Sequence, residues 1–201
     1  MKVLITANPY LLSVITSDHK FNSSEYVKID LKMVDTFSYE PIKIVLNSED
    51  EYYLVGSPEF NNYSRIKLFS ELIAYGIKPK AFVHSSSMVS ELAKVNMGSC
   101  VYSNTIIEDG VSIGFNTLVG PNTIIHKNVK IGNNCFIGPN CILEAGVIIE
   151  SNSYIENNCI LQAGIKIGKD VTIKDPGVYT ESLISGKIID KSIGDFVQIL
   201  K

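Results

Sequence analysis

The chain lacks tryptophan and has little arginine, histidine or cysteine. Among its 201 residues, one arginine stands beside seventeen lysines, and there are three histidines and four cysteines. The formal net charge is −3, so the chain lacks the basic balance of a nucleic-acid-binding protein. The small number of histidines, His19, His84 and His126, limits both metal sites and imidazole catalysis.

Long apolar runs are also absent. No stretch approaches the roughly 18–20 apolar residues that a membrane helix needs. The apolar stretch at 1–6 is too short for a signal peptide, so we expect a cytoplasmic protein without a membrane span. Hydrophobic residues make up 45% of the chain and charged residues 19%, which excludes a disordered chain.

What the sequence does have is a repeat of six residues. From Val95 to Ile173 every first position is Val, Ile or Leu, without an insertion. Every fourth position holds a residue that tolerates positive φ. These residues are Gly98, Asn104, Gly110, Asn116, Asn122, Asn128, Asn134, Asn140, Gly146, Asn152, Asn158, Gly164 and Asp170. Each hexad is therefore predicted to be a short strand followed by a tight corner.

Three hexads predict one turn of a parallel β-helix, with successive turns about 4.8 Å apart. A β-sandwich alternates with a period of two and does not place Asn or Gly at every sixth residue. The fifth positions are small or β-branched, and Cys135, Cys141 and Cys159 among them are predicted to point into the tube as small hydrophobic residues. No Cys-X-X-Cys spacing indicates zinc, so we expect no metal.

The first eighty residues have no hexad pattern and predict a small α/β domain. Short strands are expected at 2–6, 26–31, 41–46 and 52–56, and an apolar stripe predicts a helix over 62–75. The predicted domains are an α/β domain (1–80), the β-helix (81–178) and a C-terminal segment (179–201) that caps the open end of the coil.

The hexads resemble those of the hexapeptide-repeat acyltransferases, whose fold is a left-handed parallel β-helix. The stretch Tyr53–Gly56, the helix after it and the segment Ile77–Ser85 are similar to a narrower subgroup. This subgroup comprises the bacterial nucleotide-amino-sugar N-acetyltransferases and the sialic-acid O-acetyltransferase-like proteins. The resemblance implies a mainly β fold class, a left-handed parallel β-helix preceded by a small α/β domain that binds a nucleotide sugar.

The resemblance also implies an activity, an acyl donor and an assembly. The activity is transfer of an acetyl group from acetyl-CoA to an amino sugar or a sugar hydroxyl in bacterial surface-glycan biosynthesis, such as that of lipopolysaccharide. The assembly is a homotrimer, in which acetyl-CoA lies along the coil axis between two subunits. The acceptor is a small sugar molecule, attached to a nucleotide in the subgroup.

Residues eighteen apart lie one turn apart on the same face, and this spacing predicts a site. The second positions give the column Glu108, His126, Glu144, Gln162, with His126 between two carboxylates. A carboxylate beside an imidazole can fix the tautomer of the ring, which suits a general base. His126, Glu108 and Glu144 are therefore the predicted catalytic residues.

The columns beside this one predict where the two substrates bind. Small residues leave a shallow strip for the pantetheine arm, and backbone N–H groups of the strip, such as that of Gly146, are predicted to stabilise the oxyanion. Lys127 and Asn128 are predicted to contact the acceptor. The predicted cofactor-binding residues are Ala145, Gly146, Ala163, Gly164 and Lys169.

The sequence departs from the subgroup at three places. The turn after the first strand, at 6–11, has no glycine, and the subgroup's second histidine corresponds to Phe136. Its catalytic histidine occupies the third position of the hexad, which is Lys127 here. One residue along a strand reverses the side-chain direction. Either the backbone bulges locally, or His126 works from a different direction, or no side-chain base is used.

Two other functions stay open at this point. A trimeric β-helix module without catalysis fits the missing glycines and the displaced histidine. A metal enzyme like the γ-class carbonic anhydrases uses three interfacial histidines. Only His84 and His126 lie in the predicted coil, seven hexads apart, and seven is not a multiple of three, so they are expected on different faces.

Overall fold

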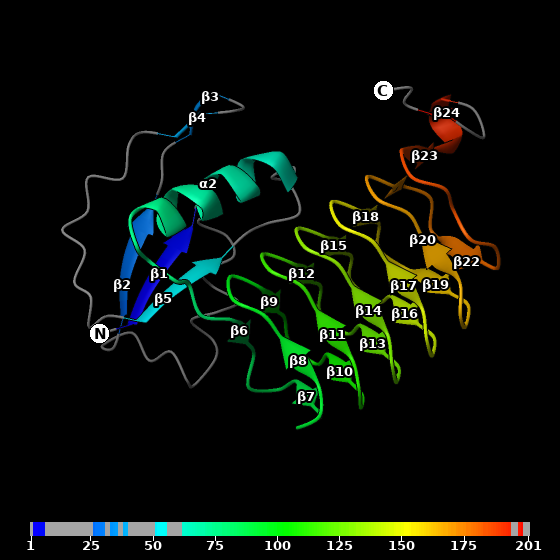
Figure 1. The fold of residues 1–201 in the computed structure, drawn as a ribbon, viewed down its shortest axis with the longest axis horizontal. Coiled ribbons are helices and arrows are strands. Elements are labelled where there is room, and N and C mark those ends of the chain that lie inside the picture. Colours follow the sequence, from blue (N-terminus) through cyan, green and yellow to red (C-terminus); the bar gives the residue numbers. More distant parts are fainter. Residues whose placement is uncertain are drawn as a thin grey trace.

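The computed structural model describes residues 2–6, 26–30, 33–35, 38–39, 51–55, 62–193 and 197–198. Within these ranges, a small parallel sheet and one helix precede a long three-sided β-helix (Figure 1). The predicted strand at 41–46, the turn at 7–11 and His19 lie outside the described residues. No helix of the described part has the length and apolar character needed to cross a membrane.

The N-terminal sheet is parallel, with the strand order β2–β1–β5. Its strands are β1 (Lys2–Thr6), β2 (Tyr26–Asp30) and β5 (Glu51–Val55). Helix α2 (Asn62–Ala74) follows, and Gly76 ends it with a φ of 79°, the left-handed conformation of a helix C-cap. These elements confirm the expected strands and helix to within two residues. The short antiparallel pair β3 (Met33–Asp35) and β4 (Ser38–Tyr39) was not predicted.

Three sheets form the sides of the β-helix, and, apart from β24, each strand pairs in parallel with the strand one turn away. The six-stranded sheet contains β7 (Met88–Val89), β10 (Ile106–Ile107), β13 (Ile124–Ile125), β16 (Ile142–Leu143), β19 (Cys159–Leu161) and β22 (Gly177–Tyr179). The five-stranded sheet contains β8 (Lys94–Val95), β11 (Ser112–Ile113), β14 (Lys130–Ile131), β17 (Ile148–Ile149) and β20 (Lys166–Ile167). The eight-stranded sheet contains β6 (Phe82–Val83), β9 (Cys100–Val101), β12 (Leu118–Val119), β15 (Phe136–Ile137), β18 (Tyr154–Ile155), β21 (Thr172–Ile173), β23 (Lys187–Ile189) and β24 (Val197–Gln198).

The corners have the predicted backbone conformation. All the Gly, Asn and Asp residues at fourth positions from Gly98 to Asp170 have positive φ, between 54° and 75°. The first-position side chains from Val101 to Ile173 are buried in the tube, together with the three fifth-position cysteines. The tube core is therefore the one that the hexads predict.

Two of the three corner columns carry an additional polar ladder inside the tube. Fifth-position hydroxyl groups donate to the carbonyl oxygen fifteen residues on: Ser99 Oγ to Gly114 O at 2.6 Å, and Thr117 Oγ1 to Gly132 O at 2.9 Å. Thr123, at the next corner, bonds Gly138 O in the same way at 3.0 Å. The third corner column has only aliphatic fifth positions, which are Val111, Val129, Val147 and Ile165. Its backbone carbonyl groups therefore have no such partner.

The coil continues past the last hexad with a changed spacing. Leu183 forms a bridge to Ile167, and Ile189 pairs with Ile173, each sixteen residues on. The 3-10 helix η1 (Lys191–Ile193) follows, and β24 then pairs antiparallel with β23. An aliphatic residue at each inner position keeps the turn in register although the corner pattern is lost.

Helix α2 and β5 pack against the first turns of the β-helix. Arg65, which is 4% exposed, donates Nη2–H to Gly98 O at 2.6 Å and Nε–H to Asn116 O at 3.2 Å. The thiol of Cys100 donates to Leu54 O at 3.1 Å, so this cysteine lies outside the tube under the N-terminal sheet. The chain's single arginine therefore joins the helix to two corners.

Candidate functional site

The corner between the six-stranded and five-stranded sheets differs from the other two. We call it the open corner, and it comprises residues 109–110, 127–128, 145–146 and 163–164. An added Cβ at Gly146 or Gly164 meets no atom within 4 Å, so the corner is bare toward its C-terminal end. Backbone polar groups that remain unbonded on the outside of such a corner can bind a ligand with amide groups, such as a pantetheine arm.

His126 and Glu108 form a hydrogen-bonded pair beside the open corner. His126 Nδ1 lies 3.0 Å from Glu108 Oε1, and Glu108 Oε2 accepts the backbone N–H of Lys127 at 2.9 Å. The two side chains are 38% and 41% exposed, respectively. A carboxylate is an acceptor only, so Nδ1 carries a proton, and in the neutral ring the lone pair is on Nε2. The imidazole is thus held in the tautomer that a general base requires.

The backbone around His126 is regular. His126 N donates to Leu143 O at 2.9 Å, Asn128 N donates to Asp109 O at 3.0 Å, and Asn128 has a φ of 62°, as at other corners. A local bulge is therefore ruled out as the explanation of the displaced histidine. His126 projects from the outer face of the six-stranded sheet, on the same side of the strand as Ile124.

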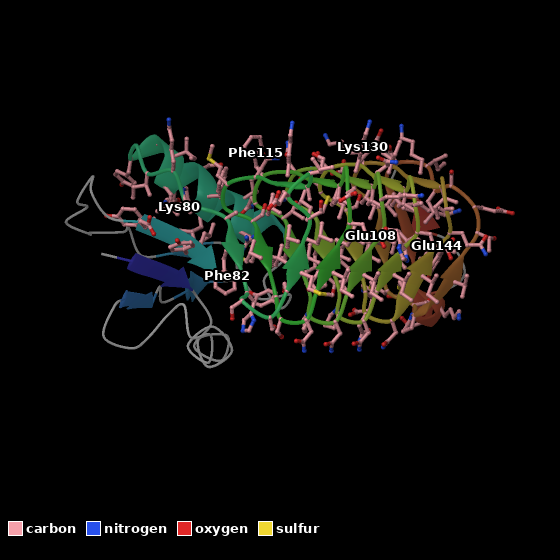
Figure 2. The ribbon with its side chains drawn as sticks, turned by 90° about the horizontal axis from the view of Figure 1, so that it is seen from below. Lys80, Phe82, Glu108, Phe115, Lys130 and Glu144 are labelled. Carbon is pink, nitrogen blue, oxygen red and sulfur yellow. The ribbon has the colours of Figure 1, made fainter. Side chains whose placement is uncertain are left out.

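Glu144 lies one turn beyond His126 in the same column, but no hydrogen bond joins the two side chains among the described residues. Glu144 Oε2 accepts the N–H of Ala163 at 2.9 Å instead. Figure 2 shows Glu108 and Glu144 in one row along the coil axis. Each carboxylate bonds a backbone N–H nineteen residues on, so both turn toward the C-terminal end of the coil. Of the two carboxylates, Glu108, on the preceding turn, is the one that bonds the histidine.

Ala145 has a free backbone donor at the open corner. Gly146 N–H, the oxyanion donor expected from the sequence, already donates to Lys127 O at 3.0 Å. Lys127 and Ala163 have their N–H groups bonded to carboxylates, whereas the N–H of Ala145 has no acceptor among the described residues. The N–H groups of Lys127 and Ala163 are each accepted by the glutamate nineteen residues before them. The residue nineteen before Ala145 is His126, and its ring bonds Glu108 instead. The histidine at position 126, where the neighbouring turns have glutamate, is the sequence signal that indicates this donor.

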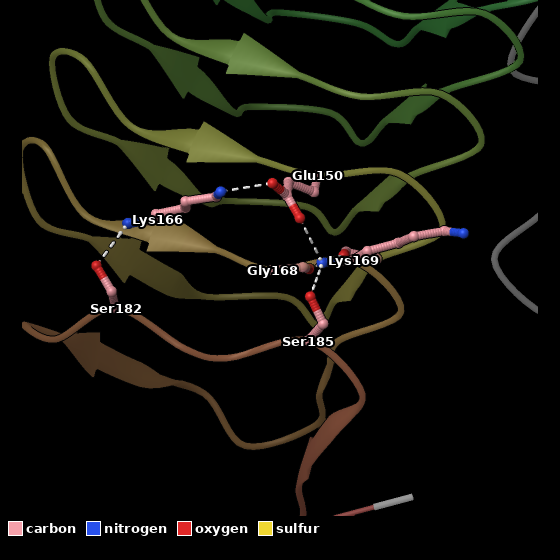
Figure 3. Close-up of polar contacts among 7 residues, drawn as sticks. Glu150, Lys166, Gly168, Lys169, Ser182 and Ser185 are labelled. Atoms are coloured by element: carbon pink, nitrogen blue, oxygen red, sulfur yellow. Dashed lines mark hydrogen bonds and ion pairs between the residues drawn. The ribbon is translucent and has the colours of Figure 1, made fainter. Parts of the chain in front are cut away.

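Lys169 lies at a different corner from the other predicted cofactor-binding residues. It follows β20 and precedes β21, at the corner between the five-stranded and eight-stranded sheets. Its backbone N–H donates to Glu150 Oε2 and Ser185 Oγ, both at 3.0 Å (Figure 3). Lys166, two residues past Gly164, lies next to the C-terminal end of the open corner, and its Nζ lies 2.6 Å from Glu150 Oε1.

Lys127 and Asn128 lie at the open corner directly after His126, and both are exposed. Among the described residues, no group of three or more His, Cys, Asp or Glu side chains is arranged to hold a metal ion. His84 and His126 lie on the eight-stranded and six-stranded sheets, respectively.

Two family models match part of the hexad repeats. The model "Bacterial transferase hexapeptide (six repeats)" matches residues 110–145, and the model "Hexapeptide repeat of succinyl-transferase" matches residues 128–163. The predicted recognition of hexapeptide repeats of the acyltransferase type is confirmed over these residues. The chain has no match among the curated proteins.

Solved structures show a similar fold over nearly the whole chain. The acetyltransferase domain of PglB from Neisseria gonorrhoeae, in complex with acetyl coenzyme A, superposes with a TM-score of 0.78 at 16% identity, covering 98% of each chain. PerB from Caulobacter crescentus, in complex with CoA and GDP-perosamine, gives a TM-score of 0.75 at 17% identity, covering 98% of this chain and 96% of that chain. The expected fold class, a left-handed parallel β-helix after a small α/β domain, is confirmed.

The pKa of Glu108 depends on its hydrogen bond with His126. The hydrogen bond from His126 and then that from the Lys127 N–H hold the pKa of Glu108 below its usual value. In a His126→Ala variant we expect this pKa to rise toward that of an ordinary glutamate, because the larger cause is removed. A titration of the side-chain carboxyl carbon by NMR measures the change. An unchanged pKa would mean that the pair does not form in solution.

Proposed function

We propose that this protein transfers an acetyl group from acetyl-CoA to an amine or a hydroxyl group of a sugar. The observation that carries the proposal is the His126–Glu108 pair beside a bare corner with the free N–H of Ala145. A general base with a fixed tautomer and an unused backbone donor are two groups that assist acyl transfer from a thioester. The fold is that of solved structures described as acetyltransferases with acetyl-CoA or CoA bound.

In this proposal His126, Ala145 and Glu108 have different roles in the transfer of the acetyl group. The acceptor nitrogen or oxygen attacks the thioester carbon while His126 Nε2 takes its proton, and the Ala145 N–H donates to the oxyanion. When the carbon–sulfur bond breaks, the sulfur of coenzyme A leaves as a thiolate and receives that proton from His126. Glu108 accepts the Nδ1–H bond and stabilises the imidazolium that forms between the two steps.

Acetyl-CoA is placed along the open corner in this proposal. Its pantetheine arm lies over Ala145, Gly146, Ala163 and Gly164, with the nucleotide end toward Lys166 and, one corner away, Lys169. Lys127 and Asn128 are proposed to contact the acceptor. The subgroup resemblance supports two finer assignments, a nucleotide-linked acceptor and a place in surface-glycan biosynthesis. We also propose a cytoplasmic location.

A homotrimer is the proposed assembly. The outer face of the six-stranded sheet carries an aliphatic column, Met88, Ile106, Ile124, Ile142, Ile160 and Val178. Its two end residues are 64% and 59% exposed, whereas the corresponding column on the eight-stranded sheet is buried at Phe82, Leu118 and Phe136. His126 stands beside Ile124, so a second copy docked on the column adjoins the site.

Release of coenzyme A tests the proposal. Purified protein is incubated with acetyl-CoA and a panel of amino sugars, free and nucleotide-linked, and the freed thiol is measured with a disulfide reagent. We expect thiol release that depends on one class of acceptor. Absence of acetyl-CoA binding at millimolar concentration in calorimetry contradicts the proposal and favours the non-catalytic module.

A further inference from the structure

The carboxylate of Glu108 holds two consecutive residues, His126 and Lys127. Its Oε1 bonds His126 Nδ1 at 3.0 Å, and its Oε2 accepts the backbone N–H of Lys127 at 2.9 Å. Because both bonds end on one carboxylate, the imidazole has a fixed position relative to the backbone from which the Lys127 side chain extends.

The side chain of Lys127 is exposed at the open corner, one turn before Ala145. The register of the two strands, Ile125 opposite Leu143, places Lys127 opposite Ala145, about 4.8 Å away at the spacing of neighbouring strands. The flexible four-carbon stem of a lysine spans that distance. Ala145 and Gly146 carry nothing larger than a methyl group, so the ε-amine of Lys127 can reach the free N–H of Ala145.

No partner holds this amine in another direction. Lys166, the next lysine along the open corner, is paired with Glu150, whereas Lys127 Nζ has no ion pair or hydrogen bond among the described residues. The hydrogen bond from His126 is the largest cause of the lowered pKa of Glu108, and the charge of Lys127 is a smaller one. The ammonium group therefore lies on the same side of the coil as the His126–Glu108 pair.

We propose that the amine of Lys127 is itself acetylated by acetyl-CoA bound at the open corner when no acceptor is present. The inference rests on the proposed transferase function and adds to it a modification of the protein at the same site. Lysine amines are nucleophiles toward carbonyl carbon. Acetylation also removes the positive charge that Lys127 is proposed to offer the acceptor.

The chemistry uses the groups already assigned to the transfer. The neutral amine of Lys127 attacks the thioester carbon while His126 Nε2 takes a proton from the nitrogen, and the Ala145 N–H donates to the oxyanion. When the carbon–sulfur bond breaks, the sulfur of coenzyme A leaves as a thiolate and receives that proton from His126. The products are an amide on Lys127 and free coenzyme A, and no other reactant is needed.

Peptide mapping by mass spectrometry tests the inference, after incubation of the full chain with acetyl-CoA and no sugar. Lys130 is the matched control, since it is also exposed but lies on the five-stranded sheet, and Figure 2 shows it on a different side of the coil from Glu108. We expect Lys127 to be acetylated about 10²-fold faster than Lys130, the lower end of what a positioned base contributes. In His126→Ala the rate at Lys127 is expected to fall to near that of Lys130, and added coenzyme A is expected to slow Lys127 alone.

The outcomes distinguish this inference from the proposed function. If Lys127 and Lys130 react equally fast in protein that binds acetyl-CoA, the inference is wrong and the transferase proposal stands. A rate at Lys127 that His126→Ala leaves unchanged also overturns the inference, because the proton then does not go to the histidine. Failure to bind acetyl-CoA, by contrast, counts against the transferase proposal itself.

Discussion

Replacing His126 with alanine is expected to lower kcat by about 10²–10⁴-fold, the usual contribution of a positioned general base. The KM for acetyl-CoA is expected to stay near its wild-type value, because the ring holds the acceptor's proton rather than the thioester. Thiol release at saturating acceptor measures both constants. The thermal unfolding midpoint is expected to remain unchanged, since the side chain lies on the outer face of the six-stranded sheet and packs in no core.

Glutamate variants supply the matched control for this result. Glu108→Gln removes the charge that orients and supports the imidazole, so we expect a smaller fall in kcat, about tenfold. Glu156 occupies the same hexad position on the eight-stranded sheet, where it bonds Tyr154 Oη–H at 3.1 Å, and Glu156→Gln is expected to leave kcat unchanged. Equal effects of the two glutamine variants would indicate a general loss of stability. Full activity of His126→Ala would remove the histidine from the mechanism.

Replacing Gly138 with alanine is expected to destabilise the fold by about 3 kcal/mol, at the upper end of overpacking effects. A Cβ at this position would lie 2.5 Å from Asn157 N and 2.7 Å from Glu156 C, which are backbone atoms of the next turn. The stacked turns cannot move apart without breaking ladder hydrogen bonds, so the strain stays in the folded state. Denaturant unfolding measures the change, and the melting temperature is expected to fall by roughly 10 °C.

Gly146 is the matched control, because the space around it is open. An added Cβ there meets nothing within 4 Å, and only the φ of 73° opposes a side chain. Gly146→Ala is therefore expected to cost about 1 kcal/mol, the strain of one left-handed residue. If both substitutions destabilise equally, the close approach of the turn at Gly138 is not the cause.

The sequence alone determined the coil to the level of single residues. A strict period of six with aliphatic first positions allows one kind of packing, so strands, corners, buried cysteines and the column of Glu108, His126 and Glu144 all follow from counting. The reason is that each turn contacts only the next, and a fixed spacing then translates directly into neighbours. The expected strands and helix of the N-terminal domain that lie within the described residues followed from ordinary apolar patterning.

Only the tertiary structure decided which of these neighbours interact. Counting placed His126 between two carboxylates, but the direction in which Glu144 turns depends on the backbone N–H of Ala163, which no spacing reveals. The same holds for Gly146, whose N–H is occupied, and for Ala145, whose N–H is free. The bonds of Arg65 to Gly98 O and Asn116 O depend on packing between the N-terminal helix and the coil, which the hexads do not describe. The six-residue period determines where each residue lies along the coil. Which backbone and side-chain groups are free to react or bind depends on the hydrogen bonds that form in the folded structure.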